Sequence, residues 1–376
     1  MSKTIYNTNC NNIPSLPTIL PEANRIIAIG DVHGDMKLVI DSLVISKVII
    51  PSKSKLNTVQ VKLNNKYYNY EWIGNDTIVV QIGDQNDSCR PNQNGCDHIK
   101  DDTPDDVAIL DFFTKLHEFA ILKGGGVYSL LGNHELMNVN GDLKYTSNAN
   151  INQFKKYKDP YTNKVYNGTA SENMRIAFQP GNEYANFMGC TRQSILIIGD
   201  FLFVHAGIND YFLENFRGRE NLPRLNKLVK NWLLNKLNEI SKDSELLDEL
   251  INHAENSPFW NRVLGQLPPH LPYNSRECRN ALKPIIEAYK IKGMIIGHTP
   301  QTGDGINSTC SNKLFRIDVA ASKAFNDRRE PQVLEIRRMD DGMYKYTVIF
   351  QKQEVYESIV PDDITSFGRM ESRLPN

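Results

Sequence analysis

The chain has 376 residues, 40% of them hydrophobic, which is enough to bury the core of one large domain or of two ordinary ones. Lys and Arg number 43 against 44 Asp and Glu, so the formal net charge of −1 offers no general attraction to nucleic-acid phosphates or anionic membranes. We therefore expect a globular protein with no nucleic-acid partner and no membrane partner.

The chain ends and the cysteines bear on the expected compartment. Residues 1–25 contain no apolar stretch of signal-peptide length, and no run elsewhere approaches a membrane span. The six cysteines are spread thinly, unlike those of a disulfide-rich secreted scaffold, which predicts a cytoplasmic protein. Cys89 and Cys96 are close enough to bridge across a loop, but they could also share a metal or be two unrelated thiols.

Short, β-branched and nearly continuous apolar runs predict strands that are buried on both faces. In chain order these strands are 25–29, 77–82, 127–131, a pair within 194–206, 293–297 and 313–319. Apolar residues at three- and four-residue spacing predict helices at 35–47, 106–123 and 225–240. The alternation of strands and helices predicts an α/β fold.

The other segments are expected to be additions to one core domain. An insertion in its first half is expected to be a hairpin that turns at Asn64 and Asn65, and a last hairpin is expected to turn at Asp341 and Gly342. The predicted organisation is an N-terminal extension (1–24), a core domain (25–350) with a hairpin insertion (51–77) and a helical cap insertion (209–290), and a C-terminal tail (351–376).

Five of the predicted strands end in a small residue or a turn that is followed by a side chain of a metal-binding type. In α/β sheets the functional crevice lies at the carboxyl ends of the strands, so these groups are expected to converge. They are Asp31 and His33 in IIAIGDVHG, Asp84 in VVQIGDQND, Asn133 and His134 in SLLGNHE, His205 in FLFVHAG and His298 in MIIGHTP.

This convergence predicts bound metal ions. Carboxylates packed together in a buried crevice repel one another and lose their hydration, and metal cations remove that cost. Carboxylate oxygen together with imidazole nitrogen favours Mn, Fe or Zn over Ca or Mg. Six ligand-type side chains are too many for one ion that must also leave room for water and substrate, so two ions per chain are expected.

Each motif taken alone also has a structural explanation. Asp31 could cap the following helix, and a single histidine such as His33 is more often hydrogen-bonded than metal-bound. Capping does not explain five such motifs at five strand ends. The remaining histidines are expected to be structural or exposed: His98, His117, His253 and His270.

The motifs GDVHG, GDQND, GNHE, VHAG and GHT, in this order, resemble the signature of the calcineurin-like metallophosphoesterases. The stretch GNHELMNVNGDLKY is also similar to a motif of the Shewanella-like branch of the phosphoprotein phosphatases. The resemblance runs from about Arg25 to Ile336. It implies a sandwich of two mixed β-sheets flanked by helices, with an inserted helical cap.

The resemblance also implies roles for the strand-end residues around two divalent or trivalent metal ions. Manganese is expected, with iron or zinc as alternatives. A hydroxide between the metals would attack phosphorus in line, while His134, oriented by Asp87, would protonate the leaving group. The implied ligands are Asp31 and His33 for one metal, Asp84 for both, and Asn133, His205 and His298 for the second.

One motif departs from the family pattern. Phosphoprotein phosphatases have an arginine directly after GD-x-x-D that grips phosphate oxygens, whereas Ser88 stands there in this chain. We expect Arg90 and Arg262 to replace it, with Asn133 also contacting the substrate. Residues 88–96 could re-aim Arg90, more firmly if the two cysteines of this loop are bridged.

Both arginines have structural alternatives. Arg90 could pair with the acidic run 97–106, and Arg262 could pack its stem on Trp260. If neither binds phosphate, Arg192 is the next candidate.

These features predict a dinuclear metal-dependent phosphomonoesterase, and specifically a protein phosphatase with phosphoprotein or phosphopeptide substrates. Whether it prefers phospho-Ser/Thr or phospho-Tyr stays open, as do the biological target and the oligomeric state. The first alternative is a nucleotide hydrolase of the dinucleoside tetraphosphatase type, for which segment 209–290 would have to form a base-binding wall. The second alternative, motivated by Ser88, is a weakly catalytic module that binds phosphoproteins.

Overall fold

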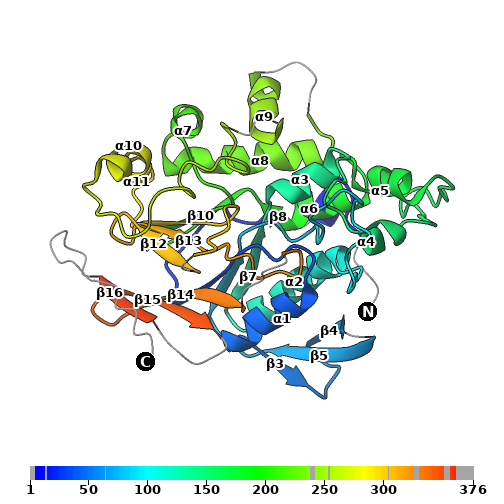
Figure 1. The fold of residues 1–376 in the computed structure, drawn as a ribbon, viewed down its shortest axis with the longest axis horizontal. Helices are drawn as coiled ribbons and strands as arrows, with labels where there is room; N and C mark the ends of the chain where they lie inside the picture. The colour runs from blue at the N-terminus through cyan, green and yellow to red at the C-terminus, as the bar shows by residue number, and fades with distance from the viewer. Residues whose placement is uncertain are drawn as a thin grey trace.

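The computed structural model describes residues 5–12, 15–63, 65–237, 242–252, 255–303, 305–325, 330–350 and 356–360. Two mixed β-sheets form the centre of the molecule, and helices flank them (Figure 1). The predicted α/β sandwich of two mixed sheets flanked by helices is therefore confirmed.

The larger sheet has seven strands. Their order is β16 (Tyr356–Val360), β15 (Tyr344–Phe350), β14 (Gln332–Arg338), β2 (Arg25–Ile29), β6 (Ile78–Gln81), β7 (Gly126–Leu130) and β8 (Arg192–Gln193). Strands β2, β6 and β7 are parallel, with Ala28 opposite Val80 and Val80 opposite Tyr128. Their carboxyl ends therefore share one edge. The last hairpin, β14 to β15, turns at Gly342 as predicted, with a φ of 82°.

The second sheet has six strands. Their order is β1 (Ile19–Leu20), β9 (Ile195–Ile198), β10 (Phe201–Val204), β11 (Gly293–Ile296), β13 (Leu314–Arg316) and β12 (Asn307–Thr309). Strands β10, β11 and β13 are parallel, with Phe203 opposite Ile295 and Ile295 opposite Phe315. The carboxyl ends of these three strands also share an edge.

A third, small sheet lies between β2 and β6 in the sequence. It consists of β3 (Ile49–Ser52), β5 (Lys66–Trp72) and β4 (Thr58–Leu63), in this spatial order. Strands β4 and β5 form a hairpin in which Leu63 pairs with Lys66 and Asn65 has a left-handed φ of 62°; Asn64 lies outside the described residues.

Two helices connect the parallel strands of the larger sheet, α1 (Met36–Ile45) and α2 (Asp106–Ile121). Asp35 caps α1 by accepting a hydrogen bond from Leu38 N at 3.0 Å. The remaining helices are η1 (Cys10–Asn12), α3 (Asn133–Val139), α4 (Asn148–Asn152), α5 (Ala170–Phe178), α6 (Glu183–Thr191), α7 (Asp210–Phe216), η2 (Arg219–Asn221), α8 (Leu222–Leu233), α9 (Lys242–Asn252), α10 (Arg276–Ala281) and α11 (Lys283–Tyr289).

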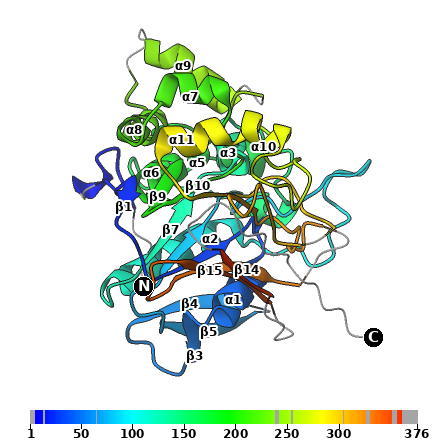
Figure 2. The same cartoon turned by 90° about the vertical axis from the view of Figure 1, so that its left-hand side faces the viewer.

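The helices α7 to α11 fall in the segment predicted to be a cap. Figures 1 and 2 place them on one side of the sandwich, opposite α1 and the small sheet. The predicted helix 225–240 is partly wrong, because α8 ends at Leu233. Asn235 has a left-handed φ of 52°, and Lys236 N bonds back to Asn231 O at 2.8 Å. Asparagine tolerates this conformation, which commonly ends helices; residues 238–241 lie outside the described part.

Side chains of the six-stranded sheet alternate between two hydrophobic cores. Ile195 and Ile197 belong to the core that is shared with the helices α3 and α5 to α11. Leu196 and Ile198 belong to the core shared with the larger sheet and with α1 and α2. Burial on both faces explains the nearly continuous apolar runs of these strands.

All six cysteines are paired, as Cys10–Cys190, Cys89–Cys96 and Cys278–Cys310. The first pair links the N-terminal segment to α6. For Cys89 and Cys96 the sequence allowed a bridge, a shared metal or two unrelated thiols, and the structure has the bridge. Disulfides persist in oxidising environments, so three of them weigh against the cytoplasmic location expected from the sequence. In the described part of the chain, no helix has both the length and the apolar character needed to cross a membrane.

Candidate metal centre

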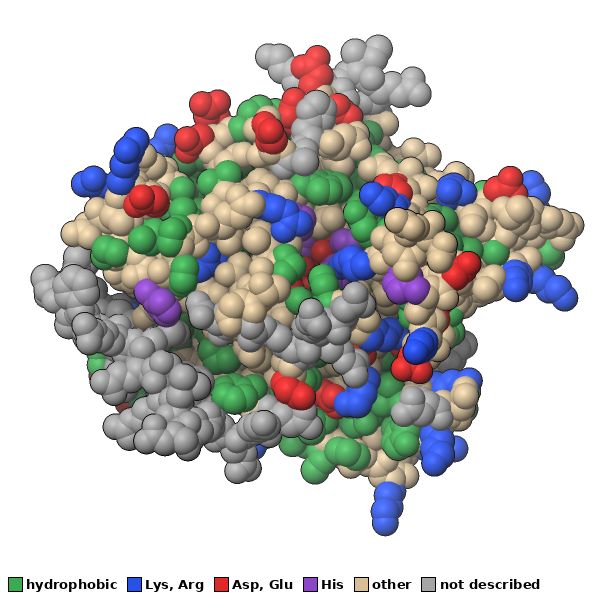
Figure 3. All heavy atoms as spheres, in the orientation of Figure 1, with side chains coloured by type: hydrophobic (Ala, Val, Ile, Leu, Met, Phe, Trp, Pro, Cys, Tyr) green, Lys and Arg blue, Asp and Glu red, His purple; other side chains and the backbone are tan. Residues whose placement is uncertain are grey.

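The predicted strand-end residues meet at a pocket of about 500 Å³. Figure 3 shows histidine and acidic side chains at the bottom of a hollow, with basic side chains near its rim. Asp31 and His205 are buried behind the lining, where Asp31 lies 4.0 Å from His33 and His205 lies 3.3 Å from Asp84. The pocket is lined by His33, Asp84, Arg90, Asn133, His134, Met137, Asp142, Lys144, Tyr145, Trp260, Arg262, His298, Pro300, Asp318 and Phe325.

Both large sheets contribute to the site. Strands β2, β6 and β7 of the larger sheet lead to the first three motifs, and β10 and β11 of the other sheet lead to His205 and His298. Glycines in the motifs allow the close approach of these strand ends. A Cβ at Gly132 would lie 2.2 Å from Asp84 Oδ1, and a Cβ at Gly297 would lie 2.2 Å from Asp31 Oδ1. The predicted convergence is confirmed.

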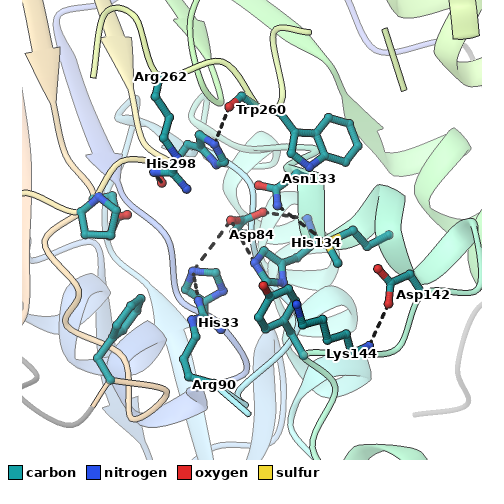
Figure 4. Close-up of a pocket in the computed structure, with 15 residues that line it drawn as sticks. His33, Asp84, Arg90, Asn133, His134, Asp142, Lys144, Trp260, Arg262 and His298 are labelled. Carbon is teal, nitrogen blue, oxygen red and sulfur yellow. Dashed lines mark hydrogen bonds and ion pairs between the residues drawn. The ribbon is translucent and has the colours of Figure 1, made fainter. Parts of the chain in front are cut away.

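Asp84 lies at the centre of the site (Figure 4). Its Oδ2 is 3.3 Å from His205 Nε2, 3.8 Å from His33 Nε2 and 3.9 Å from His134 Nε2. The backbone of Asp84 is held in a left-handed conformation (φ 53°), which is rare outside glycine. The buried carboxylate of Glu135 stabilises this turn by accepting hydrogen bonds from Asp84 N, Gln85 N and Asn86 N at 2.7 to 3.1 Å.

Each histidine predicted to bind metal has one ring nitrogen against a backbone carbonyl. The pairs are His33 Nδ1 with Asn86 O (3.3 Å), His205 Nδ1 with Ile82 O (2.9 Å) and His298 Nε2 with Trp260 O (2.8 Å). A carbonyl oxygen can only accept, so in the neutral ring this nitrogen carries the proton. The other ring nitrogen of His33 and of His205 faces the centre of the site: His33 Nε2 lies 2.9 Å from Arg90 Nη2, and His205 Nε2 lies 3.1 Å from Asn133 Oδ1 and 3.3 Å from Asp84 Oδ2. A ring with one nitrogen on a carbonyl and the other toward the site has the usual orientation of a ligating histidine.

Two compact groups of potential ligand atoms include Asp84, one with His33 and His134 and the other with His205 and His298. Within each group the atoms lie within 4.8 Å of one another. A shared carboxylate between two such groups has the position of a bridging ligand. The carboxamide of Asn133 extends the second group, with its Oδ1 3.1 Å from His205 Nε2.

Asp31 is close to the first group but is not part of it. Its Oδ2 lies 4.0 Å from His33 Nε2, and its two oxygens accept from His298 N at 3.3 and 3.0 Å. The first compact group therefore contains His134 where the sequence predicts Asp31.

Burial and neighbouring charges shift the pKa of several groups of the site. Burial lowers the pKa of the His33 ring well below its usual value, and burial with the nearby His205 and Arg262 lowers the pKa of His298 to about 3. Both rings are therefore neutral and can offer a lone pair. Burial, followed by the charge of Asp318, raises the pKa of the Asp31 carboxyl well above its usual value.

His134 is oriented by Asp87, as predicted. Its Nδ1 lies 2.9 Å from Asp87 Oδ2, and Asp87 also accepts from Asn138 Nδ2 at 2.9 Å and Thr146 Oγ1 at 2.7 Å. Burial alone would lower the pKa of His134, but the charge of Asp84 and the hydrogen bond and charge of Asp87 raise it above its usual value. The ring is therefore suited to carry a proton.

Arg90 reaches the pocket despite its displaced position in the motif. Its Nη2 lies 2.9 Å from His33 Nε2, and its Nη1 donates to the carbonyls of Asp87 at 3.2 Å and Cys89 at 2.8 Å. The guanidinium carbon lies 4.6 Å from the centre of the Phe325 ring and 5.6 Å from that of Tyr145. Arg90 makes these contacts in place of the pairing with the acidic run 97–106 that the sequence also allowed.

Arg262 approaches the pocket from the opposite side of Asp84 (Figure 4), and its Nη1 donates to His298 O at 2.9 Å. Arg192, the next candidate, is 5% exposed and is not among the lining residues. Its guanidinium donates hydrogen bonds to Gln85 Oε1, Thr114 Oγ1 and Leu110 O. Arg192 therefore stabilises the interior of the protein and does not face the pocket.

The sequence did not point to several lining residues. The most informative is Asp318, which is 2% exposed. Burial and the charge of Asp84 raise the pKa of its carboxyl to about 6, although a hydrogen bond from Ala320 N acts in the opposite direction. The sequence predicted a strand that runs to Val319, so Asp318 was not recognised as a residue that follows a strand end. In the structure β13 ends at Arg316. The aromatic side chains Tyr145, Trp260 and Phe325 had no signal of their own.

Three of the histidines predicted to be structural or exposed do not line the pocket. His117 accepts from Val127 N at 3.2 Å, His98 Nδ1 lies 3.1 Å from Gly95 O, and His270 is exposed. His253 lies outside the described residues.

Carboxylates, histidines and an amide that converge at the carboxyl ends of two facing mixed sheets define a site of the metallophosphoesterase type. A model of the calcineurin-like phosphoesterase family matches residues 24–302. The chain therefore belongs to this family, and the resemblance noted in the motifs is confirmed.

The chain is also similar to two curated proteins. The chain is 28% identical over 382 residues to Shewanella-like protein phosphatase 2 of Arabidopsis thaliana, covering 94% of this chain and 85% of that protein. It is 37% identical over 255 residues to the uncharacterized protein R398 of Acanthamoeba polyphaga mimivirus, covering 64% of this chain and 99% of the viral protein.

A solved structure shares the fold. The cold-active protein-tyrosine phosphatase of a psychrophilic Shewanella species superposes with a TM-score of 0.58 over 92% of this chain and 88% of that one. The two sequences are 20% identical, so this likeness concerns the fold alone.

Proposed function

We propose that this protein is a dinuclear metal-dependent phosphomonoesterase that acts as a protein phosphatase on phospho-Ser/Thr or phospho-Tyr. The observation that carries the proposal is the orientation of the three histidines: each has one ring nitrogen against a backbone carbonyl, and each belongs to a compact group of potential ligand atoms that includes Asp84. Support also comes from the relatives in Arabidopsis thaliana and Plasmodium berghei that are named Shewanella-like protein phosphatases.

Six residues would hold the two ions: Asp31 and His33 for the first, Asp84 for both, and Asn133, His205 and His298 for the second. The mixed set of oxygen and nitrogen donors favours manganese, with iron or zinc as alternatives. When bound, the ions would supply positive charge to the phosphate and an acidified water for in-line attack.

In this proposal His134 donates the proton that the leaving alkoxide needs. The raised pKa keeps the ring protonated, and Asp87, itself held by Asn138 and Thr146, fixes its direction. The carboxylate also stabilises the charged ring before transfer.

Arg90 and Arg262 are the proposed phosphate-binding residues, together with Asn133. The two guanidinium groups lie on opposite sides of Asp84, so a phosphate above that carboxylate would have one on each side. Phe325 and Tyr145 limit the movement of the Arg90 side chain. The role that the family pattern gives to an arginine at the position of Ser88 would thus pass to Arg90.

Elemental analysis and turnover test this function together. Protein purified without chelators should contain two metal ions per chain and hydrolyse p-nitrophenyl phosphate and a phosphopeptide, and chelation should remove activity that Mn restores. A chain that binds phosphopeptides but shows no turnover with added Mn would instead be a binding module.

Hydrolysis of dinucleoside polyphosphates is the second candidate. Trp260, from the segment that would have to form a base-binding wall, lines the pocket and could stack on a base. Product analysis with a phosphopeptide beside a dinucleoside tetraphosphate separates the two functions.

A further inference from the structure

Asp318 lies at a sixth strand end, next to the five that the sequence revealed. Strand β13 runs parallel to β11, and Asp318 follows Arg316 by two residues, as His298 follows Ile296 by two. The two loops are hydrogen-bonded, Ile317 N to Ile296 O at 2.9 Å and Gln301 N to Asp318 O at 2.8 Å. Asp318 is therefore held at the same edge of the sheet as His298.

The two carboxylate oxygens of Asp318 have different surroundings. Oδ1 accepts a hydrogen bond from Ala320 N at 3.0 Å, which supports the left-handed turn at Ala320 (φ 54°). Oδ2 is buried and has no hydrogen-bond partner among the residues that the structure describes. A buried carboxylate oxygen without a partner is costly, so its presence in the wall of the pocket calls for a ligand.

The neighbours of Asp318 indicate which ligand this is. Gly30 lets the end of β2 pack against the backbone of Ile317 and Asp318, since a Cβ there would lie 2.2 Å from Ile317 O. This contact brings Asp31 near Asp318; within the described residues Asp318 has no ion pair within 4.0 Å, and the positive groups that act on it from farther away are His205 and Arg90. Two adjacent buried carboxylates beside the His33 ring form a site for a cation.

We propose that Asp318 is a further carboxylate of the metal centre, which binds the cation on the Asp31 and His33 side through Oδ2, directly or through one water. The proposal rests on the dinuclear function proposed above. It adds a seventh residue to the six ligands expected from the family motifs, and it assigns a partner to the unpaired oxygen.

The test is Asp318→Asn, which keeps an Oδ1 acceptor for Ala320 N and replaces only the free oxygen. Manganese titration followed by electron paramagnetic resonance counts the bound ions and tells coupled pairs from single ions without an activity assay. We expect one of the two manganese ions to bind about 10- to 100-fold more weakly, the usual effect of removing a supporting group of a metal site. The coupled-pair signal should then give way to that of a single ion.

The matched control is Asp106→Asn. Asp106 is also a buried carboxylate with one oxygen that accepts a backbone N–H, from Asp87 at 3.2 Å, and one oxygen without a partner in the described structure, but it does not line the pocket. This variant should bind both ions as the unaltered protein does. If Asp318→Asn is insoluble, Asp318→Ser keeps an acceptor near Ala320 N and is titrated instead.

The outcomes separate the two proposals. Two ions bound with unchanged affinity in the Asp318 variant would overturn the role of Asp318 and leave the dinuclear function intact. Fewer than two ions in the unaltered protein would overturn the dinuclear function, and the role of Asp318 with it.

Discussion

The predicted metal ligands and the proposed phosphate-binding arginines share one pocket but are held there differently. The ligands follow strands whose hydrogen-bond ladders fix their ends, with partners such as Phe203 opposite Ile295. Arg90 instead lies on the loop 88–96, which has no strand or helix and is fixed by the Cys89–Cys96 bridge and by Phe325 and Tyr145.

This difference indicates where the sequence of such a site can vary. A strand-end ligand has one backbone position from which it reaches the centre, since a shift by one residue turns the side chain to the other face of the sheet. A long arginine on a loop can reach the same point from several positions, so Arg90 can replace an arginine at the position of Ser88 if the loop is held. We expect changes at the strand ends to abolish the site and changes on the loop to weaken it.

The largest effect is expected for Asp84→Asn, at a strand end. An amide is a poor bridge between two cations, so this variant should lose both metal retention and turnover. Elemental analysis of the purified variant and p-nitrophenyl phosphate hydrolysis check this. A variant that keeps both ions would mean that the bridge lies elsewhere.

The next effect is expected for His134→Ala. Loss of a general acid should reduce turnover of an alkyl phosphate by about 100-fold or more, with two metals retained. The loss should be smaller for p-nitrophenyl phosphate, whose leaving group needs less protonation. If metal content falls to one ion instead, His134 is a ligand, as its distance of 3.9 Å from Asp84 allows.

The strand ends could be predicted from the sequence because each combines an apolar run, a small residue and a polar ligand type. Asp318 could not, because apolar alternation continues through Val319 while the hydrogen-bonded strand stops at Arg316. The position of the Arg90 guanidinium depends on Phe325 and on the pairing of Cys89 with Cys96. A contact more than 200 residues away leaves no local pattern, and cysteine spacing alone does not establish a bridge.

A moderate effect is expected for Arg90→Ala on the loop. Removal of a charged hydrogen-bond donor should reduce kcat/KM by about 10- to 100-fold, with KM raised and kcat lowered together, because both the substrate and the transition state carry phosphate charge. Inhibition by inorganic phosphate should weaken in parallel. Arg90→Lys should recover only part of the loss, since lysine lacks the bidentate geometry. If Arg90→Ala leaves KM and phosphate inhibition unchanged, Arg262 alone binds the phosphate.

The smallest effect is expected for the joint change Cys89→Ser and Cys96→Ser, which keeps Arg90 but frees its loop. The arginine must then be ordered when substrate binds, which should raise KM about twofold to tenfold, the cost of immobilising one long side chain, while metal content stays at two.

The bridge Cys278–Cys310 offers the control, because it lies in the cap and the second sheet, away from the lining residues, and its removal should leave KM unchanged. In an Arg90→Ala background the loss of the Cys89–Cys96 bridge should raise KM little further, since the effects of changing two groups that act through one another do not add. An equal rise in KM with and without Arg90 would show that the bridge acts on the pocket by another route, and the contrast between fixed strand ends and a re-aimed loop would not hold.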